Sequence, residues 1–255
     1  MKYAMGRPIK VVMLGVGGTG GYIARDLYRI LHSTGRPVRF IICDGDNVEA
    51  KNLVRQNFIE HDLNRNKAQV LAERYASAFG MEVEFIPQFI EDESRLAEIV
   101  TPDRYGYSHY AHDSIEEHVI LIGAVDNHKS RKMCDSVFRK AKNLIYIDSG
   151  NGEHSGQIVC GLRRKGRTYY KPVADLYPEI LETDEDDKFP SELSCADAAL
   201  AAPQSIAANL MAATAVVCMV YRIITEGTIE VQKIFFNTNL VQMQPTIHKK
   251  RRTAA

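Results

Sequence analysis

The sequence has 255 residues, of which 45% are hydrophobic and 25% charged, proportions typical of a soluble globular protein. Its 32 basic and 32 acidic side chains cancel, so no global field favours nucleic acid or an anionic membrane as a partner. The five cysteines are odd in number and form no Cys-x-x-Cys pair, which argues against a disulfide framework and a paired zinc site and favours a reducing cytoplasm.

The chain opens with a predicted strand, a glycine-rich turn and a predicted helix. Residues 11–14 are apolar and predict a buried strand, and apolar residues recur at helical spacing over 23–31. Between them lies GVGGTG, residues 15–20, which fits the pattern G-x-G-x-x-G. A strand, this turn and a helix together favour the binding of a nucleotide, whose phosphates would meet backbone N–H groups at the start of the helix.

Each glycine of the turn has a physical reason. Gly15 permits the tight turn, Gly17 lets the backbone approach a phosphate, and Gly20 lets helix and strand pack closely. The pattern alone does not select one chemistry, because nicotinamide dehydrogenases share it.

The second predicted strand, VRFIICD, ends in the loop DGDNVEAKNLVRQ at residues 44–56. Asp44 stands where a carboxylate would accept hydrogen bonds from ribose hydroxyls. Arg55 follows within the same loop and Lys67 lies at the start of the next predicted helix. A dinucleotide pocket has no evident need for these two cations, so the loop departs from a dehydrogenase.

The remaining elements predict an α/β fold, Rossmann-like, with a mostly parallel sheet, helices on both faces and antiparallel strands near the C-terminus. The predicted elements are a helix over 66–80 ending at Gly80, strands over 82–90 and 118–127, a helix over 128–142, and strands over 144–150, 156–164 and 231–246. Residues 169–192 carry no periodicity and predict a long crossover loop. We expect one domain over residues 1–255.

The longest apolar run, residues 206–224, contains Asn209 and Arg222 and is rich in alanine. These features predict a buried helix and not a membrane span. Its small residues would allow close packing in the core or across a dimer interface.

The carboxyl ends of parallel strands face one crevice, so the glycine turn, Asp44, Arg55, Lys67 and Asp126 are expected to converge. Two cations and a further acid beside a nucleotide suit a triphosphate with magnesium. If a carboxylate attacks the α-phosphate of ATP, the cations would offset the repulsion and stabilise the departing pyrophosphate. Asp126 would hold magnesium, although it is equally able to cap the following helix.

The sequence resembles the ThiF/MoeB/HesA family of ubiquitin-activating-type adenylating enzymes. The resemblance rests on GVGGTG, DGDNVEAKNLVRQ, Lys67 and AVDNHKSR, and it covers residues 9–160 best. It implies ATP-dependent adenylation of the C-terminal glycine of a small ubiquitin-like or sulfur-carrier protein, and a homodimer. The site residues that it implies are Gly15, Gly17, Gly18, Gly20, Asp44, Asp46, Asn52, Arg55, Gln56, Lys67, Asp126 and Asn127, with magnesium on Asp126.

Two departures from the family pattern are visible. The two zinc-binding CxxC pairs found in many members are absent, so we expect no structural zinc. Only eight residues, MKYAMGRP, precede the first strand, and they leave the arginine that many members extend to the partner's ATP unassigned.

Cys195 differs from the other four cysteines, which we expect to be buried small hydrophobes. It follows the crossover loop and precedes the apolar helix, where a helix N-terminus would favour its thiolate. Cys195 therefore is a candidate thioester acceptor, as the resemblance also implies, or a packed residue of the first helical turn. The other candidate functions are adenylation without an enzyme thioester, a non-catalytic partner subunit and a nicotinamide oxidoreductase. If Cys195 accepts the thioester, a conjugating-type enzyme is a further expected partner.

Overall fold

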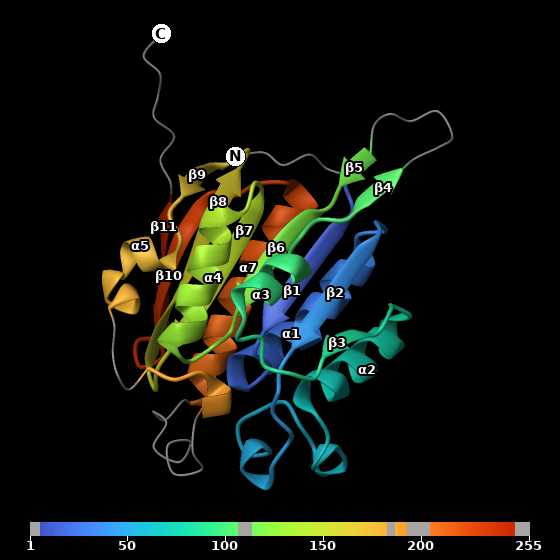
Figure 1. Ribbon diagram of the computed structural model, residues 1–255. Coiled ribbons are helices and arrows are strands. Elements are labelled where there is room, and N and C mark those ends of the chain that lie inside the picture. The colour runs from blue at the N-terminus through green and yellow to red at the C-terminus, as the bar shows by residue number, and fades with distance from the viewer. Residues whose placement is uncertain (1–5, 107–113, 183–186, 193–204, 248–255) are drawn as a thin grey trace.

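The computed structural model describes residues 6–106, 114–182, 187–192 and 205–247. Its main sheet has nine strands (Figure 1). In spatial order they are β11 (Gln242–Ile247), β10 (Val231–Asn237), β8 (Ser155–Arg164), β7 (Leu144–Asn151), β6 (His118–Gly123), β1 (Ile9–Leu14), β2 (Val38–Cys43) and β3 (Glu84–Ile86), with β9 (Arg167–Tyr170) beside β8. Strands β7, β6, β1, β2 and β3 pair in parallel, and the pairings from β7 through β8 to β11 are antiparallel. The predicted fold class is confirmed.

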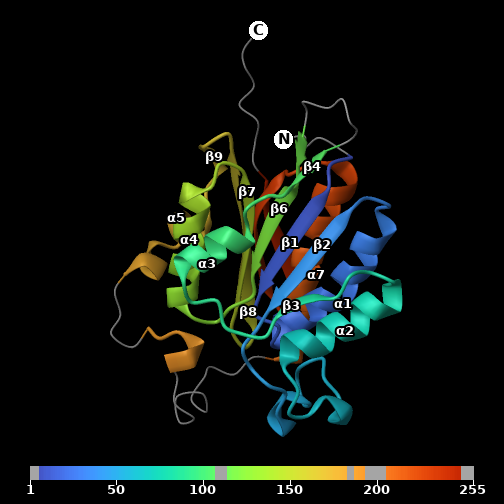
Figure 2. The same cartoon turned by 45° about the vertical axis from the view of Figure 1, so that its right-hand side comes forward.

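Helices cover both faces of this sheet (Figures 1 and 2). One face carries α1 (Gly18–Ser33), α2 (Lys67–Phe79) and α7 (Ile206–Glu226), and the other carries α3 (Glu93–Ile99), α4 (His128–Lys140) and α5 (Val173–Leu176). Short 3-10 turns are η1 (Ala50–Asn52), η2 (Glu60–Asp62), η3 (Pro178–Leu181) and η4 (Pro190–Glu192). Strands β4 (Arg104–Gly106) and β5 (Ser114–Glu116) form a separate hairpin.

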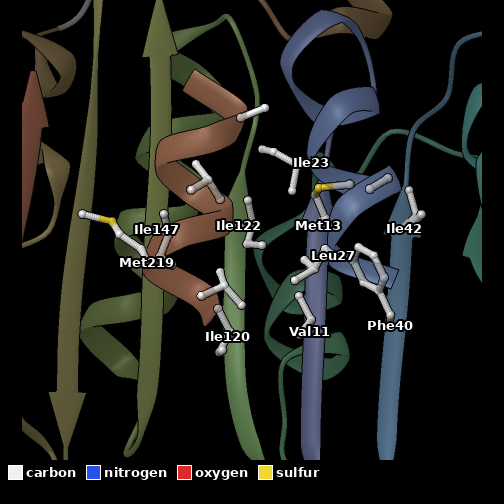
Figure 3. Close-up of a cluster of buried hydrophobic side chains, with 14 of the residues drawn as sticks. Val11, Met13, Ile23, Leu27, Phe40, Ile42, Ile120, Ile122, Ile147 and Met219 are labelled. Carbon is white, nitrogen blue, oxygen red and sulfur yellow. The ribbon is translucent and has the colours of Figure 1, made fainter. Parts of the chain in front are cut away.

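Two layers of apolar side chains hold the helices to the sheet. Strand β1 is buried at every position because both of its faces are covered. Val11 and Met13 face α1, where Ile23 and Leu27 pack against them (Figure 3). Val12 and the alternate residues of neighbouring strands belong to the second cluster, under α3 and α4. The alternation fixes the register of β1, because a shift by one residue would exchange the two layers.

Several predicted segments differ in the structure. The predicted strand over 118–127 ends at Gly123, and the predicted strand over 231–246 is divided into β10 and β11. Strand β3 covers only Glu84–Ile86 of the predicted 82–90, because Pro87 has no N–H to continue the ladder with β2. The predicted loop over 169–192 includes α5, η3 and η4, each too short to show a period in the sequence. Gly80 ends α2 in the left-handed conformation, at φ 63°, as predicted.

Helix α7 is long and apolar enough to cross a membrane, but half of its most hydrophobic window is buried against the core. It packs on α1, β7 and β8.

Cys43, Cys134 and Cys160 are buried as expected, whereas the prediction for Cys218 was wrong: it is exposed, because it lies on the outward face of α7. The free thiol of Cys218 shares that face with Tyr221, which is 47% exposed.

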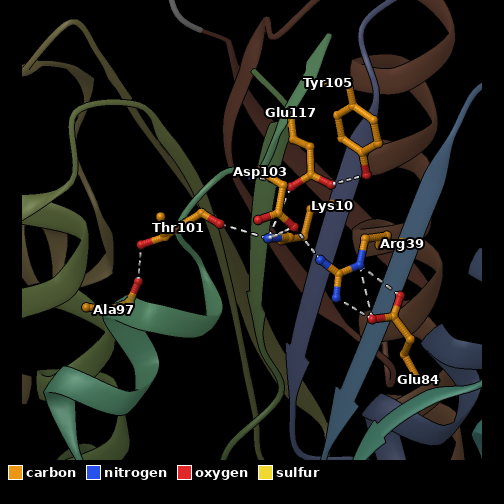
Figure 4. A network of polar contacts seen from close by, with 8 residues as sticks. All are labelled: Lys10, Arg39, Glu84, Ala97, Thr101, Asp103, Tyr105 and Glu117. Carbon is orange, nitrogen blue, oxygen red and sulfur yellow. Dashed lines mark hydrogen bonds and ion pairs between the residues drawn. The ribbon is translucent and has the colours of Figure 1, made fainter. Parts of the chain in front are cut away.

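An ionic network fastens the amino end of the sheet, opposite the ends of β1 and β2 that lead into the site. The buried Lys10 ammonium lies 3.1 Å from Glu117 and 3.2 Å from Asp103 (Figure 4). Arg39 reaches the same Asp103 carboxylate at 2.5 Å, and the Tyr105 hydroxyl donates to Glu117. These contacts hold the β4–β5 hairpin to the sheet, since Tyr105 and Asp103 lie on or beside it.

His118 begins β6 near this network. Its burial, and then the positive charges of Arg7, Arg36 and Arg164, lower its pKa to about 4. The folded protein therefore keeps this imidazole neutral at pH values where an unfolded chain would protonate it.

Candidate functional site

A cleft with a volume of about 1130 Å³ lies at the carboxyl ends of the parallel strands. Its walls come from the glycine turn, the loop after β2, the ends of β6 and β7, residues 187–190 and the first turns of α7. The predicted site residues that line it are Gly15, Gly17, Gly18, Asp44, Asp46, Asn52, Arg55, Gln56, Lys67, Asp126 and Asn127. The fold thus brings into one cleft residues that are far apart in the sequence, since Gly15 and Asn127 are separated by 112 positions.

Gly15 and Gly20 shape the turn itself. Gly15 has φ +82°, and a Cβ there would stand 2.6 Å from the carbonyl oxygen of Ala124. A Cβ on Gly20 would stand 2.1 Å from the Gly15 carbonyl oxygen, because α1 crosses β1 very closely. Both positions therefore exclude any side chain for reasons of packing, as expected for Gly20.

Gly17 and Gly18 have different surroundings. A Cβ on Gly17 would meet nothing nearer than Gln56, at 3.8 Å, so the Gly17 backbone is open to a ligand. A Cβ on Gly18 would stand 2.2 Å from the side-chain nitrogen of Asn209. A Cβ on Gly18 would therefore displace the buried Asn209 side chain at the contact of α7 with the start of α1.

Asp44 ties the end of β2 to the glycine turn. One of its carboxylate oxygens accepts from the Val16 N–H at 2.7 Å, and the other accepts from the Asp46 N–H at 2.9 Å. Burial raises the pKa of this carboxyl group, and the nearby Lys67 opposes that rise. Each oxygen keeps a second lone pair, and Asp44 lines the cleft, so the expected ribose contact stays a prediction.

Lys67 is held at the first residue of α2. Its ammonium lies 2.8 Å from the Asp46 carboxylate, and the Lys67 side chain is almost fully buried. Asn66 caps the helix and donates its side-chain amide to the carbonyl oxygens of Asp44 and Asp46. Asp46, the second acid of the loop sequence DGD, therefore positions the Lys67 ammonium. The sequence alone could not show this contact.

The end of the loop supplies one cation and two amides. Arg55 is exposed on the cleft wall, and its side chain makes no hydrogen bond or ion pair with the described part of the chain. Asn52 is buried, and its side-chain amide oxygen accepts from the Glu49 N–H at 2.8 Å, which closes the loop. The buried carbonyl oxygen of the Gln56 side chain has no partner among the described residues.

Asn127, and not Asp126, caps helix α4. The Asn127 side-chain oxygen accepts from the Ser130 N–H at 2.7 Å. Asp126 is exposed on the cleft wall, and no hydrogen bond to it occurs within the described ranges. Its carboxylate is thereby available to a cation.

A buried ion pair supports the end of β6. Arg131 donates to the Val125 carbonyl oxygen at 2.6 Å, and its guanidinium lies 3.4 Å from the Asp148 carboxylate. Burial raises the pKa of Asp148, opposed by the charge of Arg131 and the hydroxyl of Tyr146. This arrangement fixes the backbone that carries Asp126.

Three polar residues that the sequence interpretation did not place in the site meet at the back of the cleft. Asn209 of α7 accepts at its side-chain oxygen from Asn151 at 3.0 Å and lies 3.1 Å from the Thr19 hydroxyl. Thr19 also lies 3.0 Å from the side-chain oxygen of Asn151. The available signal was an asparagine within an otherwise apolar, alanine-rich helix.

Several buried polar atoms of the cleft have no hydrogen-bond partner in the described ranges. They are the Gln56 side-chain oxygen, the Asn127 and Asn209 side-chain nitrogens and the Ser149 hydroxyl. An unmatched buried group costs about 1–3 kcal/mol, so such a cluster in one cleft indicates a polar ligand. The open backbone of Gly17 and the nearby cations fit a nucleoside triphosphate.

The acidic residues fit magnesium better than zinc. No group of three or more metal-binding side chains occurs in the ranges that the structure describes. Mg²⁺ usually takes one or two protein carboxylates and completes its shell with phosphates and water, so Asp126 alone suffices beside a triphosphate.

Cys195 lies outside the described residues. The described chain on either side reaches the cleft: Asp187 and Pro190 line it, and α7, whose cap is Ser205, carries Asn209 into it. Asp187 accepts from the Lys129 N–H at 2.9 Å, which fastens the preceding segment to the start of α4.

The fold is a mostly parallel α/β fold, and its cleft brings carboxylates and cations together beside the glycine turn. The family model of the ThiF family matches residues 6–254, so the chain belongs to the ThiF family. No curated protein matches the sequence.

Solved structures share the fold. PaaA has a TM-score of 0.60 and 20% identity, over 94% of this chain and 64% of that chain. E. coli MccB with ATP has a TM-score of 0.59 and 19% identity, over 97% and 65%. The microcin C7 biosynthetic enzyme MccB in complex with N-formylated MccA has a TM-score of 0.63 and 18% identity, over 97% and 67%. The chain thus spans about two thirds of the length of these proteins.

Proposed function

We propose that this protein uses ATP to adenylate the C-terminal carboxylate of a peptide or small protein. The observation that carries the proposal is the convergence of the glycine turn with Asp44, Lys67, Arg55 and Asp126 in one cleft. Membership of the ThiF family and the fold shared with MccB, which has been crystallised with ATP and with MccA, support it.

The charges of the cleft suit attack by one anion on another. A carboxylate oxygen would attack the α-phosphorus of ATP, and the bond to pyrophosphate would break with its electrons on the leaving group. Arg55 and Lys67 would lower the repulsion and stabilise the pyrophosphate, while Asp126 would hold Mg²⁺. Lys67 is pre-positioned by Asp46, whereas the exposed Arg55 is free to turn towards the phosphates.

The substrate chain is, in this proposal, a small ubiquitin-like or sulfur-carrier protein ending in glycine. A terminal glycine has no side chain, so it would enter a cleft lined closely by backbone. The acyl adenylate would then pass to a thiol, an amine or a sulfur donor. A conjugating-type enzyme is one possible recipient.

Cys195 is the proposed acceptor when a thioester forms. Its thiolate would attack the acyl carbon, AMP would leave, and the thiol proton would go to solvent. Both flanks of its segment reach the cleft at Pro190 and Asn209, which supports a thiol close to the adenylate. Adenylation without this thioester is the alternative, with sulfur transfer or amide formation following directly.

We place the homodimer contact on the outward face of α7. Ile206, Leu210 and Tyr221 are 44%, 38% and 47% exposed on this helix, and Cys218 lies between them. A stripe of this kind is typical of a covered surface. Tyr221→Glu should then shift the sedimentation coefficient from that of a dimer to that of a monomer.

The free cysteines are consistent with a reducing cytoplasm as the location.

Titration calorimetry tests the nucleotide. The protein should bind ATP with Mg²⁺, and Asp126→Ala should lose the magnesium dependence of that binding while keeping the fold. Exchange of labelled pyrophosphate into ATP should appear on addition of a small carrier protein that ends in glycine. Tight binding of NAD⁺ without binding of ATP would contradict the proposal.

A further inference from the structure

Asn209 enters the cleft from α7, on the side opposite the cationic loop. Its side chain is fully buried and its amide oxygen accepts from Asn151. Its amide nitrogen, Nδ2, has no partner among the described residues and lies against Gly18, at the first turn of α1. A donor of this kind at the phosphate turn is matched to an acceptor oxygen of a ligand.

We propose that Asn209 binds the acyl group of the substrate, by donating from Nδ2 to the carboxylate oxygen that becomes the carbonyl of the acyl adenylate. The inference rests on the proposed function, and it assigns this residue to the polypeptide substrate and not to the nucleotide.

The order of strands separates the two sides of the reaction. Along the sheet the order is β2, β1, β6, β7. Lys67 and Arg55 follow β2, whereas Asn151 ends β7 and contacts Asn209. In-line displacement at phosphorus places the attacking and leaving oxygens on opposite sides. If pyrophosphate leaves towards the cations, the carboxylate arrives from the β7 and α7 side.

The chemistry of the donor fits an attacking carboxylate. One carboxylate oxygen forms the new bond to the α-phosphorus, and the other accepts the hydrogen bond from Asn209. A neutral amide orients the carboxylate without cancelling the charge that makes it nucleophilic. The Ser149 hydroxyl has no hydrogen-bond partner within the described ranges, and it lies on the same strand as Asn151, so it would assist from the same side.

Two synthetic probes separate the acyl group from the nucleotide. The first is 5′-O-sulfamoyladenosine, which carries the adenosine and a phosphate substitute. The second is 5′-O-(N-glycylsulfamoyl)adenosine, which adds the smallest acyl group and its carbonyl oxygen. Both are stable, so equilibrium binding to the full chain is measured by calorimetry without an identified substrate protein.

The deciding variant is Asn209→Asp, which keeps an oxygen to accept from Asn151 and replaces Nδ2 with an oxygen that repels the carbonyl. We expect the wild type to bind the glycyl probe about tenfold more tightly than the sulfamate, and the variant to lose that gain while binding the sulfamate unchanged. A variant that keeps the gain, or that weakens both probes equally, overturns the assignment to the acyl group. A wild type that binds the sulfamate but gains nothing from the glycyl group also overturns it.

Failure of the proposed function is distinguishable. A wild type that binds ATP and neither probe refutes the inference alone, whereas a wild type that binds neither probe nor ATP refutes adenylation. Asn57→Asp is the matched control, because Asn57 contacts α1 through Gly21 but does not line the cleft. If Asn209→Asp does not fold, Asn209→Ser removes the same donor, keeps a hydroxyl acceptor and should show the same selective loss.

Discussion

Replacing Gly20 with alanine should destabilise the protein strongly although alanine is the better helix former. The new Cβ would stand 2.1 Å from the carbonyl oxygen of Gly15 and 2.9 Å from its carbonyl carbon. Both atoms belong to the backbone, so the contact is relieved only if α1 moves away from β1. Overpacking of this kind costs about 3 kcal/mol, and helix propensity returns about 1 kcal/mol. The net loss is about 2 kcal/mol, or about 4–8 °C in Tm.

Thermal unfolding followed by circular dichroism measures this loss, with Gly17→Ala as the matched control. A Cβ on Gly17 meets nothing nearer than 3.8 Å, so this variant should lose at most about 1 kcal/mol. The same variant should weaken ATP binding, because its methyl group occupies the open backbone of the phosphate turn. Equal Tm values for the two variants, or a Gly20→Ala protein as stable as the wild type, would refute the assignment of packing to one glycine and ligand approach to the other.

Four further outcomes are expected. Arg55→Ala should slow carrier-dependent pyrophosphate exchange by about 10²–10³ at unchanged Tm, and exchange at the wild-type rate would remove Arg55 from the site. The pKa of His118 is lowered to about 4 in the folded protein, so between pH 6.5 and 4 the unfolded chain alone binds this proton. The stability to urea should therefore fall as the pH falls from 6.5 towards 4. His118→Gln should flatten that fall, and an identical pH profile for the variant would contradict the reasoning. ATP and the carrier should give a thiol-sensitive adduct that Cys195→Ala lacks while keeping exchange, whereas an adduct that persists moves the nucleophile elsewhere. Elemental analysis should find no stoichiometric zinc, and one zinc per chain would require a mixed Cys and His site.

The sequence predicted those parts of the fold and the cleft that depend on local patterns. Strand, turn and helix around Gly15 and Gly20 follow from apolar runs and from the steric freedom of glycine, and the structure places them accordingly. Strand ends at one edge of a parallel sheet brought Asp44 and Asp126 into the same cleft. Strand β3 was shorter than predicted because Pro87 ends its ladder.

Contacts between distant segments were beyond prediction from the sequence. The contact of Asp46 with Lys67 depends on where α2 begins in space. Helical periodicity did not show which face of α7 is outward, so the exposure of Cys218 was missed. The residue opposite Gly18 is set by how α7 crosses α1, and no local pattern encodes that crossing.

The pairing of Thr19 with Asn209 spans 190 residues, and it has a consequence for when the cleft is completed during synthesis. The motif residues up to Asn127 are all made before Asn209. The back wall of the cleft arrives only with α7. A nascent chain therefore holds a phosphate turn without its closing amide, and a long-range contact of this kind forms late because its loop-closure entropy must be met first. The cleft is therefore complete only after α7 has been made and has packed onto α1.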